Sequence, residues 1–225
     1  MDMVFMNNKI LEVEDKIVRE ILMEMMQMIA RIGVDANAEL MFAKVKPEAI
    51  IPTKRDEDAG FDMYACIEED AIFIHPHETM LIPTGIASCF SSDYMFWLAE
   101  RGSTGTKGIA QRCGIIDSGY RNEIQAPITN LNTKPLLIVK DDVKDIVRIR
   151  NKNGNIKELH IQESMNDYYE WQDIKNNSLV YPMSKAITQG ILLRIPKVKT
   201  KEIPYDELKA IPSSRGMKAW GSTQK

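Results

Sequence analysis

Apolar residues follow a helical spacing in the first part of the chain. Between Asn8 and Ile32 they recur every three or four positions, as one face of a helix requires, at Ile10, Val13, Ile17, Ile21, Met25, Met28 and Ile32. Other apolar residues widen this stripe, and Gly33 is suited to cap the C-terminal end. The pattern predicts a helix that packs on its own chain, on symmetry-related copies or on another protein.

From Leu40 onward the pattern changes to short apolar runs separated by Pro, Gly, Asp and Ser. These runs occupy residues 40–45, 61–66, 71–74, 80–82, 86–90, 94–99 and 124–128. Short strands at this spacing are typical of an antiparallel sandwich or barrel. The central part of the chain is therefore predicted to be mainly β.

A later stretch, residues 140–177, predicts a hairpin followed by an aromatic cluster. Two apolar runs, 146–150 and 156–161, flank a segment that contains Asn153-Gly154, a pair that favours a tight hairpin turn. Three aromatic residues follow among acidic and amide side chains, at Tyr168, Tyr169 and Trp171. Such rings form a small satellite core, bind a partner protein or stack on bases.

The charge balance limits the classes of partner. The chain has 29 Lys and Arg against 32 Asp and Glu, a net charge of −3. A broad basic face for duplex DNA needs clustered cations, so we expect no nucleic-acid partner, although a small anionic ligand needs only a few cations. No apolar run approaches the ~20 residues that span a bilayer. Acidic residues throughout the N-terminal region are unlike a signal peptide, which predicts a cytoplasmic protein with no membrane partner.

The cysteine and histidine residues give little sign of a metal site. Cys66, Cys89 and Cys113 are odd in number and form no C-x-x-C pair, which argues against a disulfide framework or a zinc site and fits a reducing compartment. The sequence His75-Pro76-His77-Glu78 contains metal-binding side chains. Its proline and the strand that follows favour a turn over a metal site.

The segment Gly114–Ile124 contains a strong turn signal. In Asp117-Ser118-Gly119 the glycine accepts positive φ, and the Asp side chain can bond the backbone two residues further on. We expect a hairpin tip with a carboxylate and the ring of Tyr120 beside it. Such a tip either holds a flat polar base and a water molecule or is an ordinary solvent-exposed turn.

Five segments, in order, resemble the motifs of the homotrimeric dUTP pyrophosphatases (dUTPases), and in particular those of phage members with an insert between motifs three and four. They are Asp58–Ala65, Arg101–Ile109, Gly114–Ile124, Ala186–Gln189 and Arg215–Thr223. The resemblance implies a jelly-roll-like antiparallel β-barrel. The family core lacks the N-terminal helical extension, which the apolar spacing alone predicts. Together the two predict an N-terminal helical extension, a barrel core in two pieces, an inserted hairpin subdomain and a mobile C-terminal motif that closes over the site: residues 1–37, 38–139 with 178–212, 140–177 and 213–225.

The third motif implies the residues that handle the nucleoside. By resemblance, Asp117 positions and activates the water that attacks the α-phosphate, and the ring of Tyr120 excludes ribonucleotides by occupying the space of a 2′-hydroxyl. Backbone groups of Gly114, Ile115 and Ile116 would read the uracil edge. Gln111 corresponds to a position where some relatives contact the base.

The other motifs imply the residues that handle the phosphates. Arg101, Gly102 and Ser103 lie in a glycine-rich loop suited to phosphate, and Gly102 stands where most relatives have Ser. The resemblance adds Gln189 near the phosphates or the water. It also adds Asp62 as an indirect ligand of Mg²⁺ through water, and the alternative is a structural role in which Asp62 caps a turn or pairs with an Arg. From the C-terminal motif it adds a cation for the γ-phosphate, a ring that stacks on uracil and two neighbours that help to close the site: Arg215, Trp220, Gly221 and Ser222.

Together these residues predict a homotrimeric enzyme that hydrolyses dUTP to dUMP and pyrophosphate, with Mg²⁺ carried on the substrate triphosphate. The insert predicts a regulatory protein as a further partner. Two alternatives remain open. One is a dCTP deaminase, which shares the fold, and the other is a protein that keeps the dUTPase fold mainly to bind a regulator.

Overall fold

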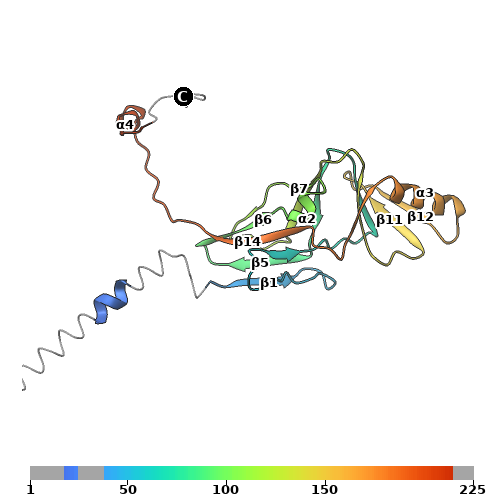
Figure 1. Cartoon of the computed structure of the whole chain (residues 1–225), viewed down its shortest axis with the longest axis horizontal. Coiled ribbons are helices and arrows are strands. Elements are labelled where there is room, and N and C mark those ends of the chain that lie inside the picture. Colours follow the sequence, from blue (N-terminus) through green and yellow to red (C-terminus); the bar gives the residue numbers. More distant parts are fainter. Residues whose placement is uncertain (1–17, 25–37, 215–225) are drawn as a thin grey trace, which may run out of the picture. The chain divides into compact units, whose positions relative to one another are not determined.

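The computed structural model describes residues 18–24 and 38–214, which form two compact units divided between Ile195 and Pro196 (Figure 1). Residues 18–24 are helical, within the segment whose apolar spacing predicts a helix. The rest of that predicted helix lies outside the described residues. The second unit contains α4 (Tyr205–Ala210). In the described ranges, no helix is long and apolar enough to cross a membrane.

The strands of the first unit form four hydrogen-bonded sheets. A two-stranded sheet pairs β1 (Leu40–Lys44) with β5 (Ile86–Phe90). A three-stranded sheet has the order β4 (Thr79–Pro83), β9 (Gln125–Asn130) and β7 (Ile109–Gln111). A four-stranded sheet has the order β2 (Phe61–Met63), β14 (Thr188–Arg194), β6 (Tyr94–Ala99) and β8 (Ile115–Ile116). A five-stranded sheet has the order β12 (Ile156–His160), β11 (Ile146–Arg150), β3 (Ala71–Ile74), β10 (Leu136–Val139) and β13 (Leu179–Pro182).

The prediction of a mainly β, jelly-roll-like fold is confirmed. Among the described strands every pair is antiparallel except β10 with β13 and β11 with β3. The strands are divided among four sheets and do not close into one continuous barrel. The helices α2 (Gly102–Gly105) and α3 (Met165–Asn176) accompany the strands.

The core fills the space between these sheets with aliphatic side chains. Ile82 and Ile128 of the three-stranded sheet pack in one cluster with Ile72 and Ile138 of the five-stranded sheet, and all four are fully buried. Burying a side chain of this size contributes roughly 1.5–3 kcal/mol. A second cluster surrounds Phe96 of β6 and includes Met63 and Ile124. These two clusters fix the strands whose ends carry the predicted site residues.

The insert extends a sheet of the core. β11 and β12 form an antiparallel hairpin around Asn151–Asn155, with Gly154 at φ 79°, as the Asn-Gly pair predicts. β11 also pairs with β3, through Ile149 opposite Ala71 and Arg150 opposite Ile72. In Figure 1 the hairpin and α3 lie together at one end of the first unit. The insert therefore shares main-chain hydrogen bonds with the core.

The three aromatic residues of the insert have different surroundings. Trp171 of α3 is 4% exposed and packs with Val147 and Leu159 of the hairpin. Of the three rings, this one is part of the small satellite core that was predicted for the segment. Tyr168 and Tyr169 are exposed and contact each other edge to face, with ring centroids 5.7 Å apart. These two rings leave an apolar face of α3 in contact with solvent.

The turn predicted after β8 is present, but the hairpin is not. The Tyr120 N–H donates to the Asp117 carbonyl oxygen at 3.0 Å, which closes the turn, and Gly119 does so without the left-handed φ expected of it. β8 pairs with β6, whereas β9 pairs with β4 and β7. The strands separate because Ile124 is fully buried and its N–H donates to the Ile86 carbonyl oxygen at 2.7 Å.

The histidine segment is also a turn, as predicted. The Glu78 N–H donates to the His75 carbonyl oxygen at 3.2 Å, and the Glu78 carboxylate accepts from the His75 N–H at 3.0 Å. His77 has φ 60°. Within residues 18–24 and 38–214, no group of three or more His, Cys, Asp or Glu side chains is placed to hold a metal ion.

Candidate active site

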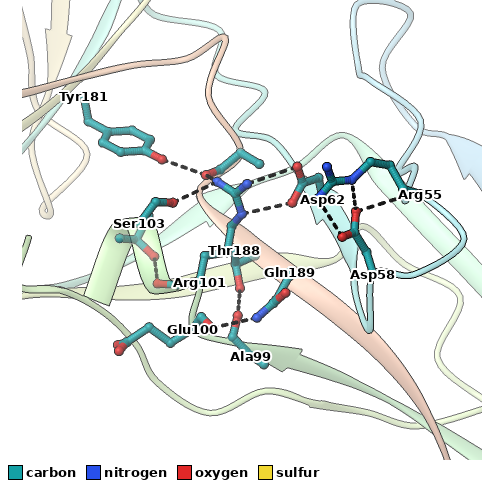
Figure 2. Close-up of polar contacts among 12 residues, drawn as sticks. Arg55, Asp58, Asp62, Ala99, Glu100, Arg101, Ser103, Tyr181, Thr188 and Gln189 are labelled. Carbon is teal, nitrogen blue, oxygen red and sulfur yellow. Dashed lines mark hydrogen bonds and ion pairs between the residues drawn. The ribbon is translucent and has the colours of Figure 1, made fainter. Parts of the chain in front are cut away.

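Arg101 lies between the end of β6 and the start of α2 and is the centre of a polar cluster (Figure 2). Its guanidinium group contacts both carboxylate oxygens of Asp62, with Nε to Oδ1 at 2.9 Å and Nη2 to Oδ2 at 3.1 Å. Nη1 donates to the Ala186 carbonyl oxygen at 2.8 Å and to Ser103 Oγ at 3.2 Å. The guanidinium therefore joins β2, α2 and the segment before β14.

The ion pair with Arg101 gives a structural role to Asp62, the carboxylate of the first motif. Sequence reasoning gave Asp62 two roles, indirect binding of Mg²⁺ or pairing with an Arg, and the structure contains the pair with Arg101. Both side chains are about one-quarter to one-third exposed, so solvent screens the attraction only in part. The charge of Arg101 is thus largely compensated within the chain, and the pair holds β2 against the phosphate-loop segment.

The polar cluster continues along β14 and the segment before it. The Tyr181 hydroxyl donates to the Ala186 carbonyl oxygen at 2.7 Å, and burial raises the pKa of Tyr181. Thr188 Oγ1 donates to the Ala99 carbonyl oxygen at 2.8 Å, and Gln189 Nε2 donates to the Glu100 carbonyl oxygen at 2.9 Å (Figure 2). These contacts fix both the phosphate-loop segment and the amide of Gln189.

A cavity of about 610 Å³ opens beside Arg101. Its lining includes residues before and within the first motif, the phosphate loop and the fourth motif: Thr53, Lys54, Arg55, Asp58, Ala59, Gly60, Asp62, Arg101, Gly102, Ser103 and Gln189. An added Cβ at Gly60 would lie 2.9 Å from Gln189 Oε1, so a side chain there would displace the Gln189 amide. Gly102 differs, since a Cβ there would meet nothing within 4 Å. The cavity has room for a side chain at position 102.

Two of the basic residues that line this cavity were missed from the sequence. Arg55 contacts Asp58 through Nε to Oδ2 at 2.9 Å and Nη2 to Oδ1 at 2.8 Å. Hydrogen bonds from the Arg55 side chain and backbone N–H lower the pKa of Asp58 to about 2. Lys54 lies near the Phe61 ring, 5.7 Å from its centroid. Among the described cations of this cavity, Lys54 is the one with no carboxylate at ion-pair distance. The signal available in the sequence was the basic pair Lys54-Arg55, which lies two residues before the first motif.

The turn residues line a second cavity, of about 390 Å³. Its lining combines the two apolar residues of β8, the turn and two residues of neighbouring strands: Leu81, Ile115, Ile116, Asp117, Tyr120 and Gln125. β8 is held close to β6, because the Leu98 N–H donates to the Gly114 carbonyl oxygen at 2.7 Å. A Cβ at Gly114 would lie 2.4 Å from the Leu98 carbonyl oxygen, so glycine is needed for this approach. The sequence did not indicate Leu81 or Gln125.

The two cavities share no lining residue. One contains Asp62, the phosphate-loop residues and Gln189, and the other contains Asp117, Tyr120 and β8. Gln111 lines neither, and its Nε2 donates to the Arg112 carbonyl oxygen at 2.8 Å and the Cys113 carbonyl oxygen at 3.4 Å. The C-terminal candidates Arg215, Trp220, Gly221 and Ser222 lie outside the described residues. Within one described chain, the predicted site is therefore present as two separate parts.

Comparisons with known proteins find similarities in both fold and sequence. The fold matches the Staphylococcus bacteriophage 80alpha dUTPase with dUPNHPP, with a TM-score of 0.55 and 19% identity over 83% of this chain and 99% of that one. Residues 46–149 match the family model for dUTPase. The chain is 29% identical over 104 residues to the deoxyuridine 5′-triphosphate nucleotidohydrolase of Leptospira interrogans, covering 44% of this chain and 71% of the relative.

A viral relative shows the same segment within a longer protein. The Pol polyprotein of equine infectious anemia virus is 34% identical over 105 residues, which are 44% of this chain and only 9% of the polyprotein. The fold and site residues define a jelly-roll-like β protein with a split polar site. Over residues 46–149 the chain is similar to the dUTPases, and its fold resembles that of a phage dUTPase.

Proposed function

We propose that this protein hydrolyses dUTP to dUMP and pyrophosphate. The observation that carries the proposal is that Asp117 and Tyr120 line one cavity beside β8, inside the range that matches the dUTPase family. In this role the Asp117 carboxylate accepts a hydrogen bond from the water that attacks the α-phosphate in line. The Tyr120 ring occupies the space of a ribose 2′-hydroxyl, and the backbone around Gly114–Ile116 reads the edge of uracil.

The 610 Å³ cavity takes the triphosphate in this proposal. The first N–H groups of a helix have no acceptor within the helix, so those of Gly102 and Ser103 at the start of α2 are suited to phosphate oxygens. Lys54 supplies positive charge, since Arg55 and Arg101 are already paired with carboxylates. Asp58 and Asp62 are engaged by these arginines, and the described chain offers no metal cage. We propose that the substrate is the Mg²⁺ complex of dUTP, since Mg²⁺ is usually carried on substrate phosphates.

A complete site requires more than one copy of the chain in this scheme. The 610 Å³ cavity (the phosphate cavity) and the 390 Å³ cavity beside β8 (the nucleoside cavity) have no lining residue in common, which favours a site in which neighbouring subunits supply the two. We propose a closed homotrimer, completed by Arg215, Trp220, Gly221 and Ser222. Mixing subunits of Asp117→Asn with subunits of Ser103→Ala tests this assembly. Mixed trimers regain part of the activity only if different copies supply the two halves, and no regain above the sum of the separate variants contradicts shared sites.

The substrate is tested directly by incubation with dUTP, dCTP, dTTP and UTP in the presence of Mg²⁺, following pyrophosphate. Release of pyrophosphate from dUTP alone is the expected result. Ammonia release from dCTP would instead support the deaminase that shares this fold. No turnover of any of the four nucleotides would favour a protein that keeps the fold to bind a regulator.

We also propose that the insert binds a regulatory protein through α3. The supporting observation is the exposed apolar face that contains Met165, Tyr168 and Tyr169, which are 65%, 40% and 61% exposed. Exposed aromatic residues are frequent in protein interfaces. Changing both tyrosines to serine leaves the buried Trp171 in place, so dUTP turnover is expected to persist while the partner is lost. Equal capture of the partner by the variant and the wild type would contradict this surface.

A further inference from the structure

Glu123 ties the segment that follows the catalytic turn to the core. Its side-chain Oε1 accepts a hydrogen bond from the Gly85 N–H at 2.6 Å. Gly85 forms the turn between β4 and β5 with φ 68°, and an added Cβ would lie 2.6 Å from the Ala49 Cβ. Ala49 is buried. The donor of this hydrogen bond is therefore fixed by packed structure, and it fixes Glu123 in turn.

Tyr120 contacts the same residue through its hydroxyl group. The Tyr120 hydroxyl donates to the Glu123 carbonyl oxygen at 2.9 Å. The ring is 41% exposed and lines the nucleoside cavity beside Asp117. Because Tyr120 is partly exposed, the position of its ring depends in part on this hydrogen bond to the Glu123 carbonyl. Tyr120, Glu123 and Gly85 thus form a chain of two hydrogen bonds from the cavity to the core.

Ile124 anchors the chain independently of the Glu123 side chain. Its carbonyl oxygen accepts from Thr84 Oγ1 at 2.6 Å, its N–H donates to the Ile86 carbonyl oxygen at 2.7 Å, and its side chain is fully buried. Removing the Glu123 carboxylate leaves these contacts intact. The Glu123 carbonyl shares a planar peptide unit with the Ile124 N–H, so the bond to Ile86 still holds that unit. The expected consequence is local, because the chain from Tyr120 to the Cα of Glu123 and the ring of Tyr120 gain freedom while the fold persists.

We propose that Glu123 is a positioning residue for sugar discrimination, acting through Tyr120. Steric rejection of a 2′-hydroxyl works only if the ring that occupies that space cannot move aside. The bond from Gly85 to Glu123 supplies this stiffness. The inference rests on the proposed function, since it assigns to Glu123 part of the preference for dUTP over UTP.

The test compares Glu123→Ala with Glu123→Gln, which keeps a side-chain oxygen able to accept from the Gly85 N–H. The measured quantity is the ratio of kcat/KM for dUTP to kcat/KM for UTP. Loss of a hydrogen bond worth about 1 kcal/mol lowers this ratio about fivefold in Glu123→Ala, chiefly by raising activity on UTP. Glu123→Gln keeps the ratio within about twofold. An unchanged ratio in Glu123→Ala, or equal loss of activity on both nucleotides, overturns the proposal.

A crystal structure of Glu123→Ala supplies a second readout that does not depend on turnover. The ring of Tyr120 is expected to shift or to become poorly ordered, with its hydroxyl no longer bonded to the carbonyl oxygen at position 123. A ring that stays in place overturns the positioning role, whatever the activity. A wild-type protein that fails to hydrolyse dUTP contradicts the proposed function instead, and the position of the ring then still decides whether Glu123 fixes it.

Discussion

The two cavities of this protein are built in different ways. The phosphate cavity is assembled by side chains that reach across the fold: Arg101 contacts residues 39 and 85 positions away, and Gln189 contacts one 89 positions away. The nucleoside cavity is formed around a turn whose contacts span three residues, from Tyr120 to Asp117 and to Glu123. Under the proposed function, changes in the first cavity should cost stability as well as phosphate binding, whereas changes in the second should affect chemistry and selectivity.

Asp117→Asn is expected to give the largest functional effect. The amide keeps the size of the side chain and the turn, but it is a far weaker acceptor for the proton of the attacking water. General-base catalysis contributes roughly 10²–10⁴-fold, so kcat for dUTP should fall by about a thousandfold. Affinity for a non-hydrolysable dUTP analogue and the thermal midpoint should both stay near wild type. Turnover that survives this change would exclude Asp117 from the chemical step.

Asp62→Asn should show the opposite pattern, with a loss of stability. It leaves the Arg101 guanidinium partly buried beside a neutral amide. Removing one partner of a fully buried pair costs ~3–5 kcal/mol, and partial exposure of both groups reduces this to about 1–2 kcal/mol in the free energy of unfolding. Urea unfolding followed by tryptophan fluorescence measures it. Asp58→Asn, which breaks the exposed pair with Arg55, is the matched control and should leave the midpoint unchanged.

Lys54→Met tests whether the uncompensated cation of the phosphate cavity contacts substrate. We expect KM for dUTP to rise about fivefold with kcat nearly unchanged, since one exposed charge-assisted contact is worth about 1 kcal/mol. The dependence of KM on salt should become shallower. Arg55→Met serves as the comparison and should change KM less, because Arg55 already pairs with Asp58. A larger effect at Arg55 would assign substrate binding to that residue.

Gly102→Ser should produce the smallest effect, and in the favourable direction. A Cβ at position 102 meets nothing within 4 Å, so the substitution fits without strain in the short helix α2. The added hydroxyl is expected to donate to a phosphate oxygen and to lower KM by about twofold to threefold. A rise in KM would show that the backbone at this position approaches the phosphates too closely for a side chain.

Local patterns in the sequence predicted the elements well and their partners less well. The β-rich centre, the hairpin around Gly154, the histidine turn and the turn that begins at Asp117 are confirmed, because each depends on residues that are adjacent or alternate along the chain. The pairing of β8 with β9 was wrong. Ile124 enters the core beside Phe96, a contact that no local pattern indicates.

The sequence by itself determined the chemistry that this protein carries: a carboxylate and a ring three positions apart, a glycine-rich loop and the order of five motifs. Only the tertiary structure decided how those groups are used. It paired Asp62 with Arg101, left Lys54 without a carboxylate partner, joined the insert to β3 and tied Tyr120 to Gly85 through Glu123. The physical reason is the separation along the chain of the residues that interact. Side-chain chemistry and turn preferences depend on neighbouring residues, whereas strand pairing and burial depend on which distant segments the core brings together.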